Sequence, residues 1–243
     1  FAYISKTNTY NYGETAYIGM QSLIYLNELY ISKKLSKPIE NIIIFNDGAN
    51  DVIHRCRTHV NGLETHRQYQ IRNRLDGGDE STLNFKYLFK PILSLVQKFK
   101  LVSSKVYHAD ENDYNCHNNK NKADLIATSL LETWLQAKKI AEANGDKFIA
   151  VLQPVVYLEN PKYDYLNDYM DIENSLISKQ FHSVYSIILD KVKNYKDLTF
   201  IDLTDIYNLD DYMYIDCCHV GPKGSQIYAQ KIYDHLRQNK FLN

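Results

Sequence analysis

The chain has 243 residues, a formal net charge of −1 from 28 Lys and Arg against 29 Asp and Glu, and 44% hydrophobic residues. This is an ordinary globular composition for one large domain, so a disordered protein, a collagen and a coiled coil are excluded, and no global charge would recruit nucleic acid. Apolar runs such as residues 42–45 are far too short for a membrane span.

The first half of the chain predicts a strand, a helix, a second strand and a polar insertion. Residues 7–11 are β-prone, and apolar residues at helical spacing predict a helix over 16–35. Residues 39–45 form a continuous apolar run, which is typical of a strand buried on both faces. A polar and irregular insertion follows at about 52–120.

The second half alternates helices with apolar strands. The patterns predict helices over 122–143, 174–192 and 221–237 and strands over 148–152 and 198–203. This alternation favours an α/β fold with a central parallel sheet, in a single domain over residues 1–243. Active residues gather at the carboxyl ends of the strands in such sheets.

Three polar blocks lie at or just beyond strand ends. They are Asn11-Tyr12-Gly13, Gly48-Ala49-Asn50-Asp51 and Asp216-Cys217-Cys218-His219, the last directly before the final helix. In this order and spacing they resemble the SGNH or GDSL-like hydrolase family, in particular its bacterial, polysaccharide-associated type. The resemblance covers nearly the whole chain and implies a three-layer α/β/α sandwich that is similar to flavodoxin.

The resemblance also implies roles for four residues. His219 would be the general base and Asp216 would orient its ring, while Gly13 and Asn50 would donate hydrogen bonds in the oxyanion hole. The chemistry suits these residue types. Ester cleavage needs a base that takes the proton of the nucleophile, which a His can do, and hydrogen-bond donors for the oxyanion that do not need to titrate, which an Asn amide and a backbone N–H are. No cofactor and no metal is implied.

The family's nucleophilic Ser has no counterpart. It belongs to a Gly-Asp-Ser block upstream of the oxyanion Gly, where this chain has only Ser5, which lacks that context. Gly78-Asp79-Glu80-Ser81 is superficially similar, but it lies in the polar insertion and follows no buried strand. Because residue 1 is Phe, we expect that the first strand and its Ser lie upstream of this chain.

Two functions therefore stay open. The first is a serine esterase or O-acyltransferase that acts on O-acetyl or other acyl esters, with an acylated bacterial surface carbohydrate or a small ester as substrate. The second is a catalytically inactive SGNH-like module that binds a glycan or a protein. The resemblance favours a periplasmic or membrane-anchored location, with the anchor upstream, over a cytoplasmic one.

The four cysteines allow one or two disulfides. Cys56 follows the Asn50 block, and Cys217 and Cys218 directly precede His219, so a disulfide from Cys56 to Cys217 or Cys218 is expected, which would imply an oxidising compartment. A zinc site is disfavoured, because adjacent cysteines rarely converge on one ion.

Several other features have both a functional and a structural interpretation. The stretch 54–74 is rich in Arg and His and is either a solvated face or a site for an anionic sugar or carboxylate. Four tyrosines either stack on sugar rings or pack their own loop: Tyr157, Tyr163, Tyr165 and Tyr169. For Asp47, Asp51 and Trp134 we expect structural roles.

Overall fold

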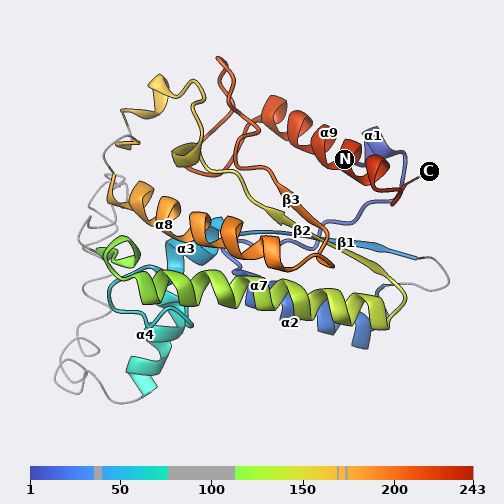
Figure 1. Ribbon diagram of the computed structural model, residues 1–243, viewed down its shortest axis with the longest axis horizontal. Coiled ribbons are helices and arrows are strands. Elements are labelled where there is room, and N and C mark those ends of the chain that lie inside the picture. Colours follow the sequence, from blue (N-terminus) through green and yellow to red (C-terminus); the bar gives the residue numbers. More distant parts are fainter. Residues whose placement is uncertain (36–39, 76–112, 169, 173–174, 243) are drawn as a thin grey trace, which may run out of the picture.

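A parallel sheet lies at the centre of the protein, which confirms the α/β class (Figure 1). The computed structural model describes residues 1–35, 40–75, 113–168, 170–172 and 175–242. In this part of the chain the sheet has the order β1-β2-β3, formed by β1 (Ile42–Asp47), β2 (Lys147–Leu152) and β3 (Phe200–Asp202). The register pairs Ile44 with Ile149 and Ala150 with Phe200.

Helices lie on both sides of this sheet in Figure 1. One side carries three helices: α2 (Gly19–Ile31), α7 (Lys120–Ala143) and α8 (Leu176–Lys191). Of these, α7 packs against both α2 and α8. The other side carries α9 (Pro222–Gln238), against which the short α1 (Ala2–Ser5) packs. The shorter elements are α3 (Ala49–Arg55), α4 (His66–Leu75), and the 3-10 turns η2 (Cys116–Asn118), η3 (Val156–Leu158), η4 (Asp164–Leu166) and η5 (Val192–Asn194).

The helix ends follow from local chemistry. Asn119 caps α7 by accepting a hydrogen bond from the Lys122 amide at 3.1 Å, and Ser175 caps α8 in the same way. Pro222 starts α9, where its missing N–H costs nothing. The predicted helices over 16–35, 122–143, 174–192 and 221–237 are all confirmed, with shifted bounds.

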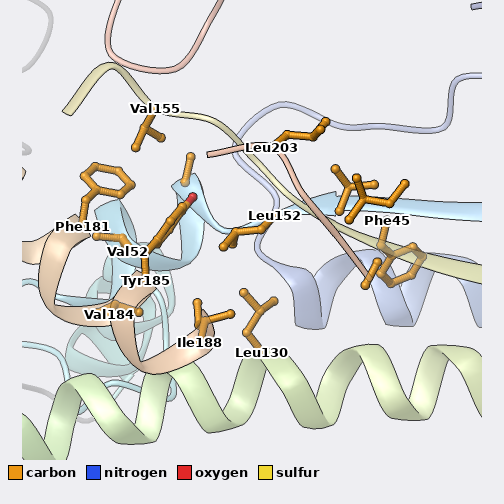
Figure 2. Close-up of a cluster of buried hydrophobic side chains, with 14 of the residues drawn as sticks. Phe45, Val52, Leu130, Leu152, Val155, Phe181, Val184, Tyr185, Ile188 and Leu203 are labelled. Atoms are coloured by element: carbon orange, nitrogen blue, oxygen red, sulfur yellow. The ribbon is translucent and has the colours of Figure 1, made fainter. Parts of the chain in front are cut away.

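The core lies between the sheet and the helices α7 and α8. Figure 2 shows Leu130, Leu152, Tyr185 and Ile188 gathered in this space, and all four side chains are buried. Every residue of β2 from Phe148 to Leu152 is buried too, as expected for a strand with a neighbour on each side. β2 is thus held by β1 and β3 on its two sides and by the helices that cover it, and this packing sets the position of the carboxyl ends of the three strands.

Two strand predictions need correction. Residues 7–11 form no strand, because no neighbouring strand in the described residues offers them a ladder of hydrogen bonds. The strand expected over 39–45 exists as β1, but it is not buried on both faces: Ile42, Ile43 and Ile44 are only half-buried. In the described sheet β1 is an edge strand, so less of its surface is covered.

The disulfide prediction was wrong in its pairing. Cys56 at the end of α3 is bonded to Cys116 of η2, and Cys217 and Cys218 carry free thiols. The backbone supports this pairing, because the Asn115 amide donates to the Cys56 carbonyl at 3.0 Å. The disulfide therefore closes the polar insertion at its base.

No described helix is long and apolar enough to cross a membrane.

Candidate active site

The loop before α9 holds His219 at its tip. The two arms of this loop meet where Tyr214 and Val220 form a β-bridge and where the Ile215 amide donates to the His219 carbonyl at 2.7 Å. The loop is also tied to the segment after β2, because the Val156 amide donates to the Cys217 carbonyl at 2.9 Å. These bonds define a short closed turn over residues 215–219.

Asp216 and His219 form a hydrogen-bonded pair within this turn. His219 Nδ1 lies 2.8 Å from Asp216 Oδ2, and Asp216 Oδ1 accepts from the amides of Cys218 at 2.9 Å and His219 at 2.8 Å. Partial burial would raise the pKa of Asp216, but the hydrogen bonds from these amides and from the ring outweigh burial and hold the pKa below its usual value. The carboxylate is therefore charged at neutral pH and accepts a hydrogen bond from Nδ1–H.

This contact sets the tautomer of the imidazole. With the proton on Nδ1, Nε2 carries the lone pair and can accept a proton from another group. The His219 side chain is 73% exposed, and no described residue forms a hydrogen bond with Nε2. Chemically, the pair is an oriented and accessible base, and no hydroxyl among the described residues is hydrogen-bonded to Nε2.

Ser5 cannot fill this position. It lies beside Lys147, which begins β2, and therefore at the amino end of the strands, whereas the His219 turn follows their carboxyl ends. Its hydroxyl also forms a hydrogen bond with the Thr7 hydroxyl at 2.7 Å. Ser81 falls outside the described residues.

Asn50 lies in the first turn of α3, directly after the carboxyl end of β1. The bend between them requires Gly48, whose φ is +127° and whose added Cβ would come within 2.6 Å of the Tyr185 hydroxyl. Asn50 Nδ2 donates to the Tyr17 carbonyl at 3.0 Å, so one of its two amide hydrogens is used. The second hydrogen is the one that an oxyanion would need.

Gly13 lies in an exposed segment. Its N–H donates to Asn11 Oδ1 at 2.9 Å, which is a local contact that competes with an oxyanion for the same hydrogen. Among the described residues, no hydrogen bond joins Gly13 or Asn50 to the Asp216–His219 pair. The oxyanion roles of Gly13 and Asn50 stay predictions.

A buried ionic network supports α3. Asp51 and Arg55, each 1% exposed, pair at 2.9 Å, and Asp51 also accepts from the Gly19 amide at 3.0 Å. Asp47 accepts from Trp134 Nε1 at 3.0 Å, and burial, reinforced by the charge of Asp51, raises its pKa to about 7. These contacts confirm the structural roles expected for both aspartates and for Trp134, and they hold the helix that carries Asn50.

Glu159 was missed by the sequence reasoning, although it is an acid directly after an apolar segment. Its carboxylate accepts from the Tyr214 hydroxyl and from the Tyr207 amide, and so anchors the loop before α9. Burial raises the pKa of Glu159 to about 7, against the effect of these two hydrogen bonds. Glu159 therefore positions the loop that carries His219.

The basic stretch 54–74 is partly neutralised by nearby acids. Besides the buried Arg55, Arg57 pairs with Asp113 and Arg72 pairs with Glu64 at 2.6 Å. Arg55 thus does not belong to a solvated face, while binding of an anion by the rest of the stretch stays a prediction.

The four tyrosines expected either to stack on sugar rings or to pack their own loop are not all alike. Tyr157 is buried and stacks on Phe181, so it packs the loop rather than a sugar. Tyr163 and Tyr165 are half-buried, and Tyr169 lies outside the described residues.

One group of possible metal ligands lies in the described residues. An oxygen of Asp216 and the sulfurs of Cys217 and Cys218 lie within 4.8 Å of one another. Cys56 is not available to a metal, because it is in a disulfide.

Comparison with known proteins adds no assignment: no family model matches the sequence, and no curated protein matches it.

Proposed function

We propose that this chain is the greater part of a serine esterase or O-acyltransferase with an SGNH-like, three-layer fold. The observation that carries the proposal is the 2.8 Å contact between His219 Nδ1 and Asp216 Oδ2, which leaves Nε2 exposed as a base. The position of this turn beyond the carboxyl ends of parallel strands also supports the proposal, since such edges host active residues.

In the proposed mechanism, a Ser hydroxyl supplied from upstream of this chain attacks the acyl carbonyl. His219 Nε2 takes the hydroxyl proton, and Asp216 stabilises the imidazolium that forms. His219 then returns the proton to the leaving alcohol, and a water or a sugar hydroxyl releases the acyl group in a second, equivalent half-reaction. Hydrolysis and transfer differ only in that acceptor.

The oxyanion would be stabilised by two donors, each of which already has one hydrogen-bond partner. Asn50 has a second Nδ2 hydrogen to offer, whereas the Gly13 N–H must leave Asn11 Oδ1. Breaking this exposed contact is cheap, because an exposed hydrogen bond exchanges with water. We therefore propose that the oxyanion hole is completed when the substrate binds or when the upstream segment with the proposed Ser packs beside it.

An acylated carbohydrate is the substrate class that we propose. The family resemblance supports it, and so does exposed apolar surface directly before Asp216, where Ile215 is 64% and Tyr212 49% exposed. An exposed aromatic ring can stack on a sugar ring. The Cys56–Cys116 disulfide supports a compartment outside the reducing cytosol.

A catalytically inactive binding module is the second candidate. It is favoured by the Gly13 N–H, which is already bonded to Asn11 Oδ1, and by the fact that no hydroxyl among the described residues is hydrogen-bonded to His219 Nε2. In that case the turn at 215–219 and the exposed Tyr212 would contact the glycan or protein partner without covalent chemistry.

The test compares His219→Ala with His182→Ala in the natural full-length protein, using an O-acetylated polysaccharide and p-nitrophenyl acetate. His182 is the matched control because it is exposed on α8. We expect His219→Ala to lower kcat/KM by about 10³-fold or more and His182→Ala to leave it unchanged. Equal activity of the two variants would contradict the mechanism, and wild-type protein that binds the polysaccharide without cleaving it would favour the binding module.

A further inference from the structure

Two adjacent free thiols lie in the sequence between Asp216 and His219, the proposed catalytic pair. Cys217 and Cys218 are both half-buried, and the Cys217 thiol donates to Cys218 Sγ at 3.8 Å. The catalytic scheme uses neither sulfur. We propose that Cys217 and Cys218 form a reversible vicinal disulfide, and that this modification disables the Asp216–His219 pair.

The oxidant is a low-molecular-weight disulfide such as oxidised glutathione. The Cys217 thiol loses its proton to solvent, and its thiolate attacks one glutathione sulfur and releases a glutathione thiolate. Cys218 then gives its proton to that thiolate, attacks Cys217 Sγ and releases the second glutathione as a thiolate, which takes up a proton from solvent. Two electrons pass from the cysteine sulfurs to the oxidant, so the products are one protein disulfide and two glutathione thiols.

The environment of the two sulfurs fits this order. The hydrogen bond with Cys217 and then burial raise the pKa of Cys218, so little of its thiol is present as the thiolate that would attack an external disulfide. The Cys56–Cys116 disulfide supports conditions in which the chain meets oxidants of this class.

A disulfide between neighbours is easily reversed. Adjacent Cα atoms are about 3.8 Å apart across a trans peptide, which is shorter than the roughly 4.4–6.8 Å that disulfides prefer. Closing the ring therefore requires rotation or distortion of the peptide between Cys217 and Cys218. Strained disulfides of this kind are readily reduced and are the labile, regulatory ones.

The same peptide carries both bonds that matter for the dyad. Its carbonyl, on Cys217, accepts from the Val156 amide at 2.9 Å, and its N–H, on Cys218, donates to Asp216 Oδ1 at 2.9 Å. Rotation of this one peptide turns both groups away from their partners. Oxidation would thus release the turn from the segment after β2 and remove one of the donors that fix the Asp216 carboxylate.

The disulfide itself is tested on the 243-residue chain in a series of glutathione redox buffers, followed by alkylation and peptide mapping. We expect the peptide with Cys217 and Cys218 to become 2 Da lighter and resistant to alkylation, and to revert in mild dithiothreitol that leaves Cys56–Cys116 intact. Cys217→Ser should abolish the change. Alkylation of both thiols across the whole series, or a glutathione adduct or linked chains as the end product, would overturn the proposal.

Amide hydrogen exchange tests the effect on the dyad without any assay of activity. On oxidation, exchange at the Cys218 amide should accelerate about tenfold or more as its bond to Asp216 is lost. The Gly221 amide, which donates to the Met213 carbonyl at 2.8 Å, is the control in the same loop and should keep its rate. An unchanged Cys218 rate in fully oxidised protein would overturn the switch.

The loss of activity rests on the proposed function, so it is measured separately in the full-length protein. Oxidation should lower esterase activity about tenfold in the wild type and leave Cys217→Ser unchanged. If the disulfide forms and the Cys218 amide responds but neither redox state is active, the proposed function fails and the modification site stands. If the protein is active and no disulfide forms, this inference alone fails.

Discussion

The hydroxyl of Tyr228 in α9 donates a hydrogen bond to Asn46 Oδ1 near the end of β1, at 2.7 Å. The bond joins two segments that are distant in sequence: the helix that starts directly after the His219 turn and the strand that leads to Asn50. Two halves of the candidate site are thus held together across the carboxyl edge of the sheet.

Tyr228→Phe should therefore affect geometry more than stability. Loss of one hydrogen bond of this kind costs about 1 kcal/mol in the free energy of unfolding, measured by urea denaturation. In the active full-length protein kcat/KM should fall several-fold, because the hydrogen bond that ties α9 to β1 is lost. Tyr233→Phe, elsewhere on α9, is the control, and an equal effect of the two variants would contradict a role for this bond.

The buried pair of Asp51 and Arg55 predicts a large loss of stability. Arg55→Met leaves a buried carboxylate without its partner and should lower the free energy of unfolding by about 3–5 kcal/mol. Lys138→Met is a matched control, because Lys138 pairs at the same spacing of four residues with Glu142, whose side chain is 51% exposed, and its loss should cost only about 0.3–0.5 kcal/mol. Similar losses in urea titrations of the two variants would show that the network is not tightly packed.

Asp47 predicts a stability that falls as the pH rises. Burial, followed by the charge of Asp51, raises its pKa from 3.8 to about 7 in the folded protein. Between these values the folded state binds the proton and the unfolded state does not, so the stabilisation present below pH 4 is lost as the pH approaches 7.

Asp47→Asn isolates this effect. The stability of the wild type relative to the variant should decrease from pH 4 to pH 7, by an amount on the order of 4 kcal/mol. Glu159, whose pKa is raised in the same way, is present in both proteins and cancels in the difference. A difference that does not change with pH would mean that Asp47 titrates normally.

The disulfide predicts a further loss of stability. It closes a sequence separation of 60 residues, and removing it by the double substitution Cys56→Ser with Cys116→Ser should cost about 4 kcal/mol. Non-reducing peptide mapping checks the pairing. A peptide that links Cys56 to Cys217 or Cys218 would contradict the structure.

Local signals account for what the sequence predicted correctly. Pro222 and the apolar spacing behind it define α9, and the polar residues around Asn119 place the start of α7. The contact between Asp216 and His219 was also predictable, because the two residues are three positions apart in one turn. Such features depend on neighbours in the chain and need no knowledge of the fold.

Features that depend on distant partners could not be predicted in this way. Residues 7–11 have the composition of a strand, yet a strand needs a neighbour to complete its hydrogen bonds. Cys56 pairs with Cys116 because η2 is packed beside the end of α3, which spacing does not reveal. For the same reason, the geometry of Gly13 and Asn50 relative to His219 was beyond sequence reasoning.

Labelling by a fluorophosphonate probe, read as intact mass, tests the central claim most directly. It is done on the 243-residue chain and on the natural full-length protein, each with its His219→Ala variant. We expect one adduct on the full-length wild type, greatly reduced labelling of its variant and none on the 243-residue chain, because His219 would then activate a Ser outside these residues. Labelling of the 243-residue chain itself, or equal labelling of wild type and His219→Ala, would contradict the account.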